Sequence, residues 1–178
     1  LQHDPRLAII DELAIDLGGP KITANAVVTW IGSDAAINAD AVLHDMPIAA
    51  LDRYWPKHLA ESPRGWVTRN MTAGTVHETK MKLSLRTGGA NPDDISVESL
   101  TGTMRFSGAE VHYLRPLPPA VDVDATAVFT RDRLLITLKS GNVLGLKADP
   151  GRINLTRLDT DSERANIELV FRGSLPEA

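Results

Sequence analysis

The side chains with the clearest catalytic potential in this sequence are its histidines and one pair of carboxylates. The histidines are His3, His44, His58, His77 and His112. They show neither the H-x-H nor the H-x-x-x-H spacing of a metal site. Asp122 and Asp124 are two residues apart, so in a strand they would share one face and could divide acid and base roles. The same spacing also occurs where two carboxylates simply face solvent on one side of a strand, and we favour this interpretation for Asp122 and Asp124.

The remaining motifs also fail to define a reaction. The segment "DTDSE", residues 159–163, has the acidic density of a calcium loop but lacks the glycine and the terminal glutamate spacing of an EF-hand. The chain contains no nucleophile elbow, phosphate-binding loop or dinucleotide fingerprint. It also has no cysteine, so thiolate catalysis and zinc–cysteine sites are excluded. We therefore expect no catalytic residue, no metal and no cofactor, and a protein that is not an enzyme.

Composition indicates a folded chain and limits its partners. The 178 residues are 43% hydrophobic and 24% charged, with a net charge of −4. The acidic balance argues against a nucleic-acid partner, which needs a basic surface. No stretch approaches the roughly 20 apolar residues that span a bilayer. Because the chain begins at Leu1 and strand-like alternation extends almost to its end, we expect one fragment, residues 1–178, of a longer protein.

Alternation with a period of two dominates the sequence and predicts β-strands. Apolar residues alternate with polar ones over the segments 22–30, 37–43, 80–86, 104–106, 134–138, 153–155 and 165–171. Turn residues connect them at 18–20, 32–34, 131–132 and 149–151, and "TGGANPDD", residues 87–94, is predicted to be a loop. Such short connections favour an antiparallel meander that forms a curved sheet or groove, or a sandwich-like pair of sheets.

One segment lacks this alternation and predicts one or two short helices at about residues 47–71. Pro47 suits a first turn, Ile48, Leu51 and Trp55 share a helical face, and Pro56 should end the helix.

A second helix should begin with Ser62 as N-cap and Pro63 at its first position, and end near Gly74. We expect strands over 1–45, helices over 46–73 and strands over 74–178. The helices could plug or cover the sheet, or pack only for stability.

The segment "VHYLRPLPPAVDVDATAVF", residues 111–129, predicts a strand over 111–116, a break at its three prolines, and a second strand from Val121. Gly102 and Gly108 upstream suggest bulges or a sharp twist. The apolar face of such strands must be covered by a second sheet, by closure of a barrel or by an apolar ligand. Its small aliphatic side chains are compatible with acyl chains and equally with a sandwich core.

Two longer phrases resemble the large AsmA-like proteins of the YhdP type. In "YWPKHLAESPRGWVTRNMTAGTV" the shared residues are Trp55, Pro56, Arg64, Trp66, Val67, Asn70 and Gly74. In "TGTMRFSGAEVHYLRPLPPAVDVDATAVF" they are Gly102, Tyr113, Pro116, Pro118, Pro119 and Phe129. The phrase "LKSGNVLGLKADPGRINLTRL" continues the similarity, which covers about residues 45–175. Asp124–Ala125 departs from it, because relatives are expected to carry a glycine there.

The resemblance implies a periplasmic protein whose parent is anchored in the inner membrane of a Gram-negative bacterium by a segment outside this fragment. It also implies a β-groove that, as in TamB and other bridge-like lipid-transfer proteins, carries phospholipid acyl chains between membranes and supports outer-membrane integrity. We expect the lipid-contacting wall to consist of Val121, Val123, Phe129, Leu134, Ile136 and Leu138, from two adjacent strands with coincident faces. The alternative is a lipid-free scaffold of the cell envelope that binds another protein through a sheet edge.

Overall fold

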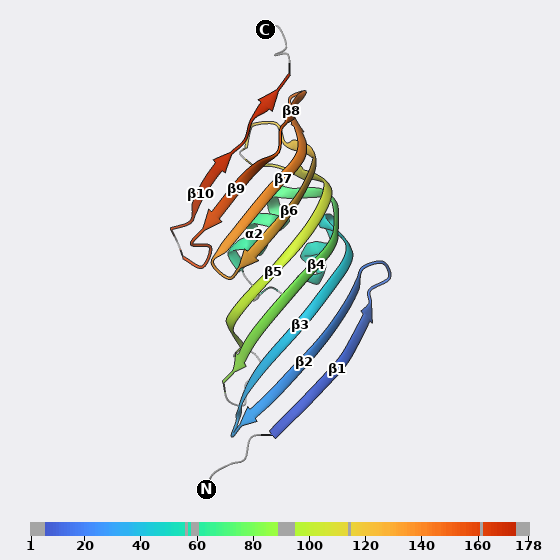
Figure 1. Ribbon diagram of the computed structural model, residues 1–178, viewed down its shortest axis with the longest axis vertical. Helices are drawn as coiled ribbons and strands as arrows, with labels where there is room; N and C mark the ends of the chain where they lie inside the picture. The colour runs from blue at the N-terminus through green and yellow to red at the C-terminus, as the bar shows by residue number, and fades with distance from the viewer. Residues whose placement is uncertain are drawn as a thin grey trace.

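A computed structural model describes residues 6–55, 57, 61–88, 95–113, 115–160 and 162–173. Within them the chain forms one 11-stranded sheet with every strand pair antiparallel, which is not closed into a barrel (Figure 1). The strands are β1 (Arg6–Asp16), β2 (Lys21–Ile31), β3 (Asp34–Pro47), β4 (Met71–Thr87), β5 (Ile95–Val111), β6 (Ala120–Thr130), β7 (Arg133–Val143), β8 (Leu146–Ala148), β9 (Gly151–Thr156), β10 (Arg164–Glu168) and β11 (Phe171–Arg172). The mainly β fold class is confirmed.

The strands follow one another in sequence order from β1 to β7, which confirms the meander. Beyond β7 the sheet divides, because β9 pairs with the first half of β7 and β8 with its last residues. The predicted turns at 18–20, 32–34 and 131–132 all connect neighbouring strands. Gly18 and Gly32 have φ of 79° and 68°, a backbone conformation that glycine adopts without strain.

The register separates the two faces of the sheet. Paired residues on neighbouring strands project to the same side, so the pairs Ala24–Ala41, Ala41–Met81, Met81–Gly102 and Gly102–Phe129 form one continuous row across five strands. Residues one position away, such as Thr23 and Lys80, project to the other side. The period-two pattern therefore gives the sheet one apolar and one polar face, as predicted.

A line of irregularities crosses β3–β6 and divides the apolar face into two regions. Asp45, Gly108 and Asp122 have positive φ of 52°, 62° and 52°, and the pairing shifts register beside Gly108 and Asp122. An extra residue at such a bulge moves the next side chain to the other face. On the apolar face, Leu43 is consequently followed by Met46, Phe106 by Ala109, and Ala120 by Val123.

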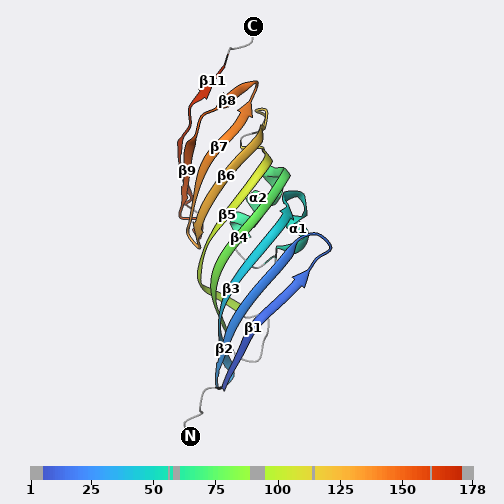
Figure 2. The same ribbon diagram turned by 45° about the vertical axis from the view of Figure 1, so that its right-hand side comes forward.

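Beyond this line the apolar face is packed into a closed core. Its buried members are Met46, Ile48, Val76, Phe106, Ala109, Val123, Ala125 and Leu138. A 3-10 helix, η1 (Ile48–Ala50), and a single helical turn, α1 (Leu51–Tyr54), contribute to it directly. Helix α2 (Glu61–Asn70) lies on the same side of the sheet, as Figure 2 shows, and none of its described side chains belongs to this core.

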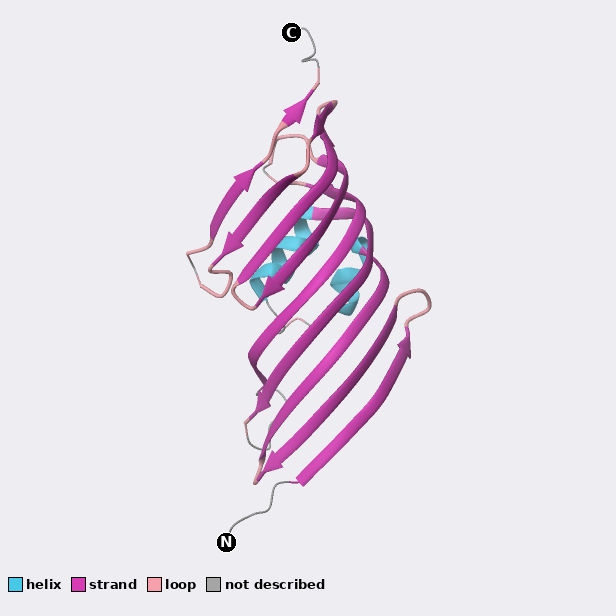
Figure 3. Cartoon of the chain, in the orientation of Figure 1, coloured by secondary structure: helices cyan, strands magenta, loops and turns pink. Residues whose placement is uncertain are grey.

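Arg64 joins α2 to α1. Its side chain is 13% exposed, and its guanidinium donates hydrogen bonds to the carbonyls of Trp55 and Asp52, both at 2.9 Å, and to the Asp52 carboxylate at 2.6 Å. Residues of η1 and α1 pack against the sheet, and only one end of the sheet carries the helices (Figure 3).

Several predicted boundaries are wrong. Gly74 does not end a helix: α2 ends at Asn70 and Gly74 lies within β4, with φ of 94°. Among the described residues, the strand predicted over 111–116 extends no further than Val111, where β5 ends, and the His112 amide donates to the Asn70 carbonyl at 2.8 Å. The strand predicted over 165–171 is interrupted at residues 169–170, between β10 and β11. Pro56 and most of the loop 87–94 lie outside the described residues.

Candidate functional site

The part of the apolar face on the other side of the irregularities has no covering layer among the residues that the structure describes. We call this region the open apolar face. Its members are Ala8, Ile10, Leu13, Ile15, Ile22, Ala24, Ala26, Val28, Trp30, Ala35, Ile37, Ala39, Ala41, Leu43, Thr79, Met81, Leu83, Leu85, Thr87, Ile95, Val97, Leu100, Gly102, Met104, Ala127, Phe129, Leu134, Ile136, Ile153 and Leu155. Except for Ala35, Thr79 and Ala127, none is buried.

Exposure distinguishes this face from a packed interior. In the closed core, Met46 and Ile48 are 2% exposed and Ala109 is 0% exposed. On the open apolar face, large side chains such as Leu83 and Ile37 are only half-buried, and Ile10 remains 41% exposed. A contiguous apolar patch of this kind is uncommon on a monomeric protein and marks a binding or interaction surface.

The structure brings together on the open apolar face three of the six residues predicted to line a lipid-contacting wall. Phe129 pairs with Leu134, while Ile136 and Leu138 pair with Ala127 and Ala125. The apolar faces of β6 and β7 therefore coincide. Phe129, Leu134 and Ile136 are half-buried members of the open apolar face.

The other three residues lie elsewhere. Val123 and Leu138 are 8% and 6% exposed and belong to the closed core. Val121 is 36% exposed and does not share their face, because the irregularity at Asp122 places Ala120 against the core instead. The assumption that alternation runs unbroken from Val121 to Phe129 is thus incorrect at its first residue.

Three of the acid–base candidates, Asp124, His77 and His112, have structural partners. The Asp124 carboxylate accepts a hydrogen bond from the Gly108 amide at 2.9 Å, joining the irregularities of β5 and β6. Asp122, at positive φ, is exposed. The rings of His77 and His112 contact Ser107 at 2.6 Å and Glu110 at 3.0 Å, while His3 and His58 lie outside the described residues.

No group of three potential metal ligands occurs in the described part of the chain. At the β6–β7 turn, the Thr130 hydroxyl donates to Asp132 at 2.6 Å, which lowers the pKa of that carboxyl. This turn is exposed. The hydrogen bond therefore stabilises the turn locally, and the lowered pKa of Asp132 does not mark a reactive cleft.

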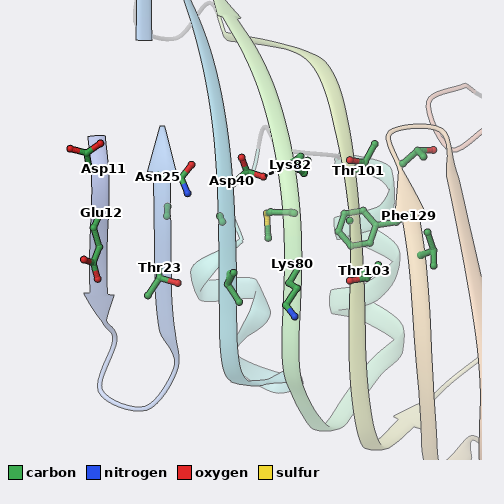
Figure 4. A pocket seen from close by; sticks show the side chains of 17 residues that line it. Asp11, Glu12, Thr23, Asn25, Asp40, Lys80, Lys82, Thr101, Thr103 and Phe129 are labelled. Carbon is green, nitrogen blue, oxygen red and sulfur yellow. Dashed lines mark ion pairs between the residues drawn. The ribbon is translucent and has the colours of Figure 1, made fainter. Parts of the chain in front are cut away.

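A shallow hollow of about 700 Å³ crosses β1–β6 (Figure 4), and its lining includes the apolar row Ala24, Ala41, Met81, Gly102 and Phe129 as well as polar residues on either side of that row. Asp40 and Lys82, 3.1 Å apart, form an ion pair at this hollow. Its other labelled polar side chains are Asp11, Glu12, Thr23, Asn25, Lys80, Thr101 and Thr103. Its mixed, solvent-exposed charges present no nucleophile–base pair.

Sequence reasoning did not identify most of this surface. The closed core and the open apolar face have the same sequence alternation, and only the residues at positive φ separate them. Asp45 and Asp122 carry no distinctive sequence signal, since aspartate is also common in turns and on polar strand faces.

Comparison with protein-family models, with curated proteins and with solved structures finds no match. Within the described residues, none of the helices is long and apolar enough to cross a membrane.

Proposed function

We propose that this chain is a non-enzymatic module that contacts lipid acyl chains through its open apolar face. The observation that carries the proposal is the contrast between the two ends of one sheet. Where η1 and α1 cover the face, its side chains are buried; where nothing among the described residues covers it, equally apolar side chains remain half-exposed over at least seven strands.

The free energy of such a surface favours an apolar ligand. Each square ångström of apolar surface removed from water is worth about 25 cal/mol, so a hydrocarbon chain laid along the strands would gain from every exposed aliphatic side chain. The backbone of the sheet is already paired in its ladders, so an acyl chain has no unsatisfied polar group to meet there. The aliphatic side chains of Ala, Val, Ile and Leu can contact an acyl chain without selecting a particular lipid head group.

The cellular part of the proposal extends the resemblance to AsmA-like proteins. The module would belong to a periplasmic protein whose parent is anchored in the inner membrane of a Gram-negative bacterium. It would take part in moving phospholipid between the inner and outer membranes and so in maintaining the outer membrane. The segments 54–76 and 101–129, which resemble AsmA-like proteins, support this proposal.

The test is binding by the purified chain. Lipid mass spectrometry on organic extracts should find phospholipid that co-purifies, and the uncharged probe N-phenyl-1-naphthylamine should increase in fluorescence when added to delipidated protein. The polar-face variant Thr103→Asp serves as a control and should bind the probe normally. A folded protein that carries no lipid and gives no probe signal would contradict the proposal.

The edge of the sheet supports a second candidate, a scaffold that binds another protein. Strand β1 pairs only with β2 among the described strands, and it carries Leu7 and Ile9, each 60% exposed, on the face opposite Ile10 and Leu13. An apolar edge strand is a template for pairing with a further strand. If this is its role, proline at an outward-facing amide of β1 should abolish partner capture while leaving probe binding unchanged.

A further inference from the structure

A single charged side chain interrupts the open apolar face. Arg6 pairs directly with Trp30 at the start of β1, so its side chain projects to the apolar side together with Ala8 and Ile10. Every member of the open apolar face defined above is apolar, glycine or threonine. Arg6 is therefore the one charged residue that the register places on this face among β1–β7 on this side of the irregularities.

The position of Arg6 makes the two ends of the open apolar face different. It lies at the strand ends away from η1, α1 and α2, at the corner of the sheet where β1 begins (Figure 1). At the opposite end, the helices and the closed core limit the exposed surface. Trp30 beside Arg6 is 37% exposed, and a partly exposed indole suits the boundary between an apolar region and a polar one.

Within the part of the chain that the structure describes, no acidic side chain contacts this guanidinium. Two other arginines near these strand ends have acidic partners: Arg86 contacts Glu98 at 2.6 Å and Arg131 contacts Asp159 at 3.2 Å. The residues beside Arg6 on its face are Trp30 and Ala8, which carry no charge. A guanidinium with free donors binds carboxylates and phosphates through paired hydrogen bonds.

Building on the proposed function, we infer that the open apolar face binds anionic amphiphiles in one orientation. The acid group contacts Arg6 beside Trp30, and the hydrocarbon chain extends over the apolar residues toward the helices. This resembles the general form of ligand sites, in which a mainly apolar wall carries a few polar groups that set orientation. Arg6 could alternatively serve only to keep an edge strand soluble, and the two roles differ in what they do to ligand preference.

The experiment measures displacement of N-phenyl-1-naphthylamine by dodecanoate and by dodecanol, which share one chain length and differ in charge. Wild-type protein should bind dodecanoate about tenfold more tightly than a variant Arg6→Gln does, the size expected for losing one charge-assisted hydrogen-bonded contact. Dodecanol should compete equally with both proteins. Arg6→Lys should retain most of the preference, and added salt should weaken it.

The matched control is Arg133→Gln. Arg133 begins β7 and is exposed on the polar face, one position from Leu134. This change also removes one positive charge, and it should leave both competitors unaffected. If Arg6→Gln and wild type bind dodecanoate equally while the probe still binds, the inference is overturned and the proposed function survives. If wild-type protein binds neither the probe nor dodecanol, the proposed function itself fails.

Discussion

The ring of Phe129 lies on Gly102, its direct partner across β5 and β6. A Cβ atom built on Gly102 would overlap the Cζ atom of that ring and would lie 2.5 Å from the Lys80 carbonyl oxygen. Figure 4 shows the ring reaching from its own strand toward the neighbouring one. Gly102 was predicted to mark a bulge, but its pairing with Met81 and Phe129 is regular. Its missing side chain is what lets an aromatic ring lie flat within the open apolar face.

Gly102→Ala should therefore displace the Phe129 ring and lower stability by about 1–3 kcal/mol, the usual cost of overpacking. The double variant Gly102→Ala/Phe129→Leu should recover part of this loss, because leucine has no ring to obstruct the new methyl group. Urea denaturation of the two single variants and the double variant gives the coupling between the sites. Additive losses would show that the Lys80 carbonyl, and not the ring, is the obstacle.

Gly74→Ala should be more damaging. Gly74 has φ of 94°, and a Cβ atom there would lie 2.6 Å from the Ser107 carbonyl oxygen and 2.7 Å from the Ala109 amide nitrogen. Backbone atoms cannot move aside as a flexible side chain can, so we expect a loss of about 3 kcal/mol or more.

Gly18→Ala distinguishes the cost of a positive φ from the cost of contact with neighbouring backbone atoms. Gly18 also has positive φ, 79°, but nothing lies within 4 Å of its Cβ position. It should cost only about 1 kcal/mol, the penalty of the left-handed conformation. Thermal unfolding that shows equal losses for Gly18→Ala and Gly74→Ala would contradict the close approach of β4 and β5.

Asp124→Ala should reduce stability without affecting lipid binding. The change removes the acceptor of the Gly108 amide, at a cost of about 0.5–1 kcal/mol, because Gly108 is exposed and water can replace the carboxylate. Asp124→Asn keeps an acceptor oxygen and should recover much of this loss, whereas Asp122→Ala, which removes an exposed carboxylate, should differ little in melting temperature from other surface variants. Loss of probe binding by folded Asp124→Ala would mean that the carboxylate takes part in ligand recognition.

The sequence predicts the repeating parts of this protein well. Period-two alternation located β2, β3, β6 and β7, and the turn residues gave their connections, because both signals depend on neighbours in the chain. What it did not predict depends on contacts between distant strands. The irregularity at Asp122 offsets the faces of the residues on its two sides, which is why Val121 was assigned to the wrong side. Val123 and Leu138 lie in the closed core because η1 and α1 cover that end of the apolar face, which alternation along the chain does not reveal.

The central claim, that one sheet has a closed and an open apolar region, is tested most directly by placing the same charge in each. Leu83 lies on the open apolar face between Ala39 and Leu100, and Leu138 lies in the closed core. Leu83→Asp should lower the melting temperature by no more than about 5 °C, because the carboxylate still reaches water, while abolishing N-phenyl-1-naphthylamine binding. Leu138→Asp buries an unpaired charge and should prevent folding. If Leu83→Asp also fails to fold, or if it folds and binds the probe as wild type does, the open apolar face is not the lipid-contacting surface.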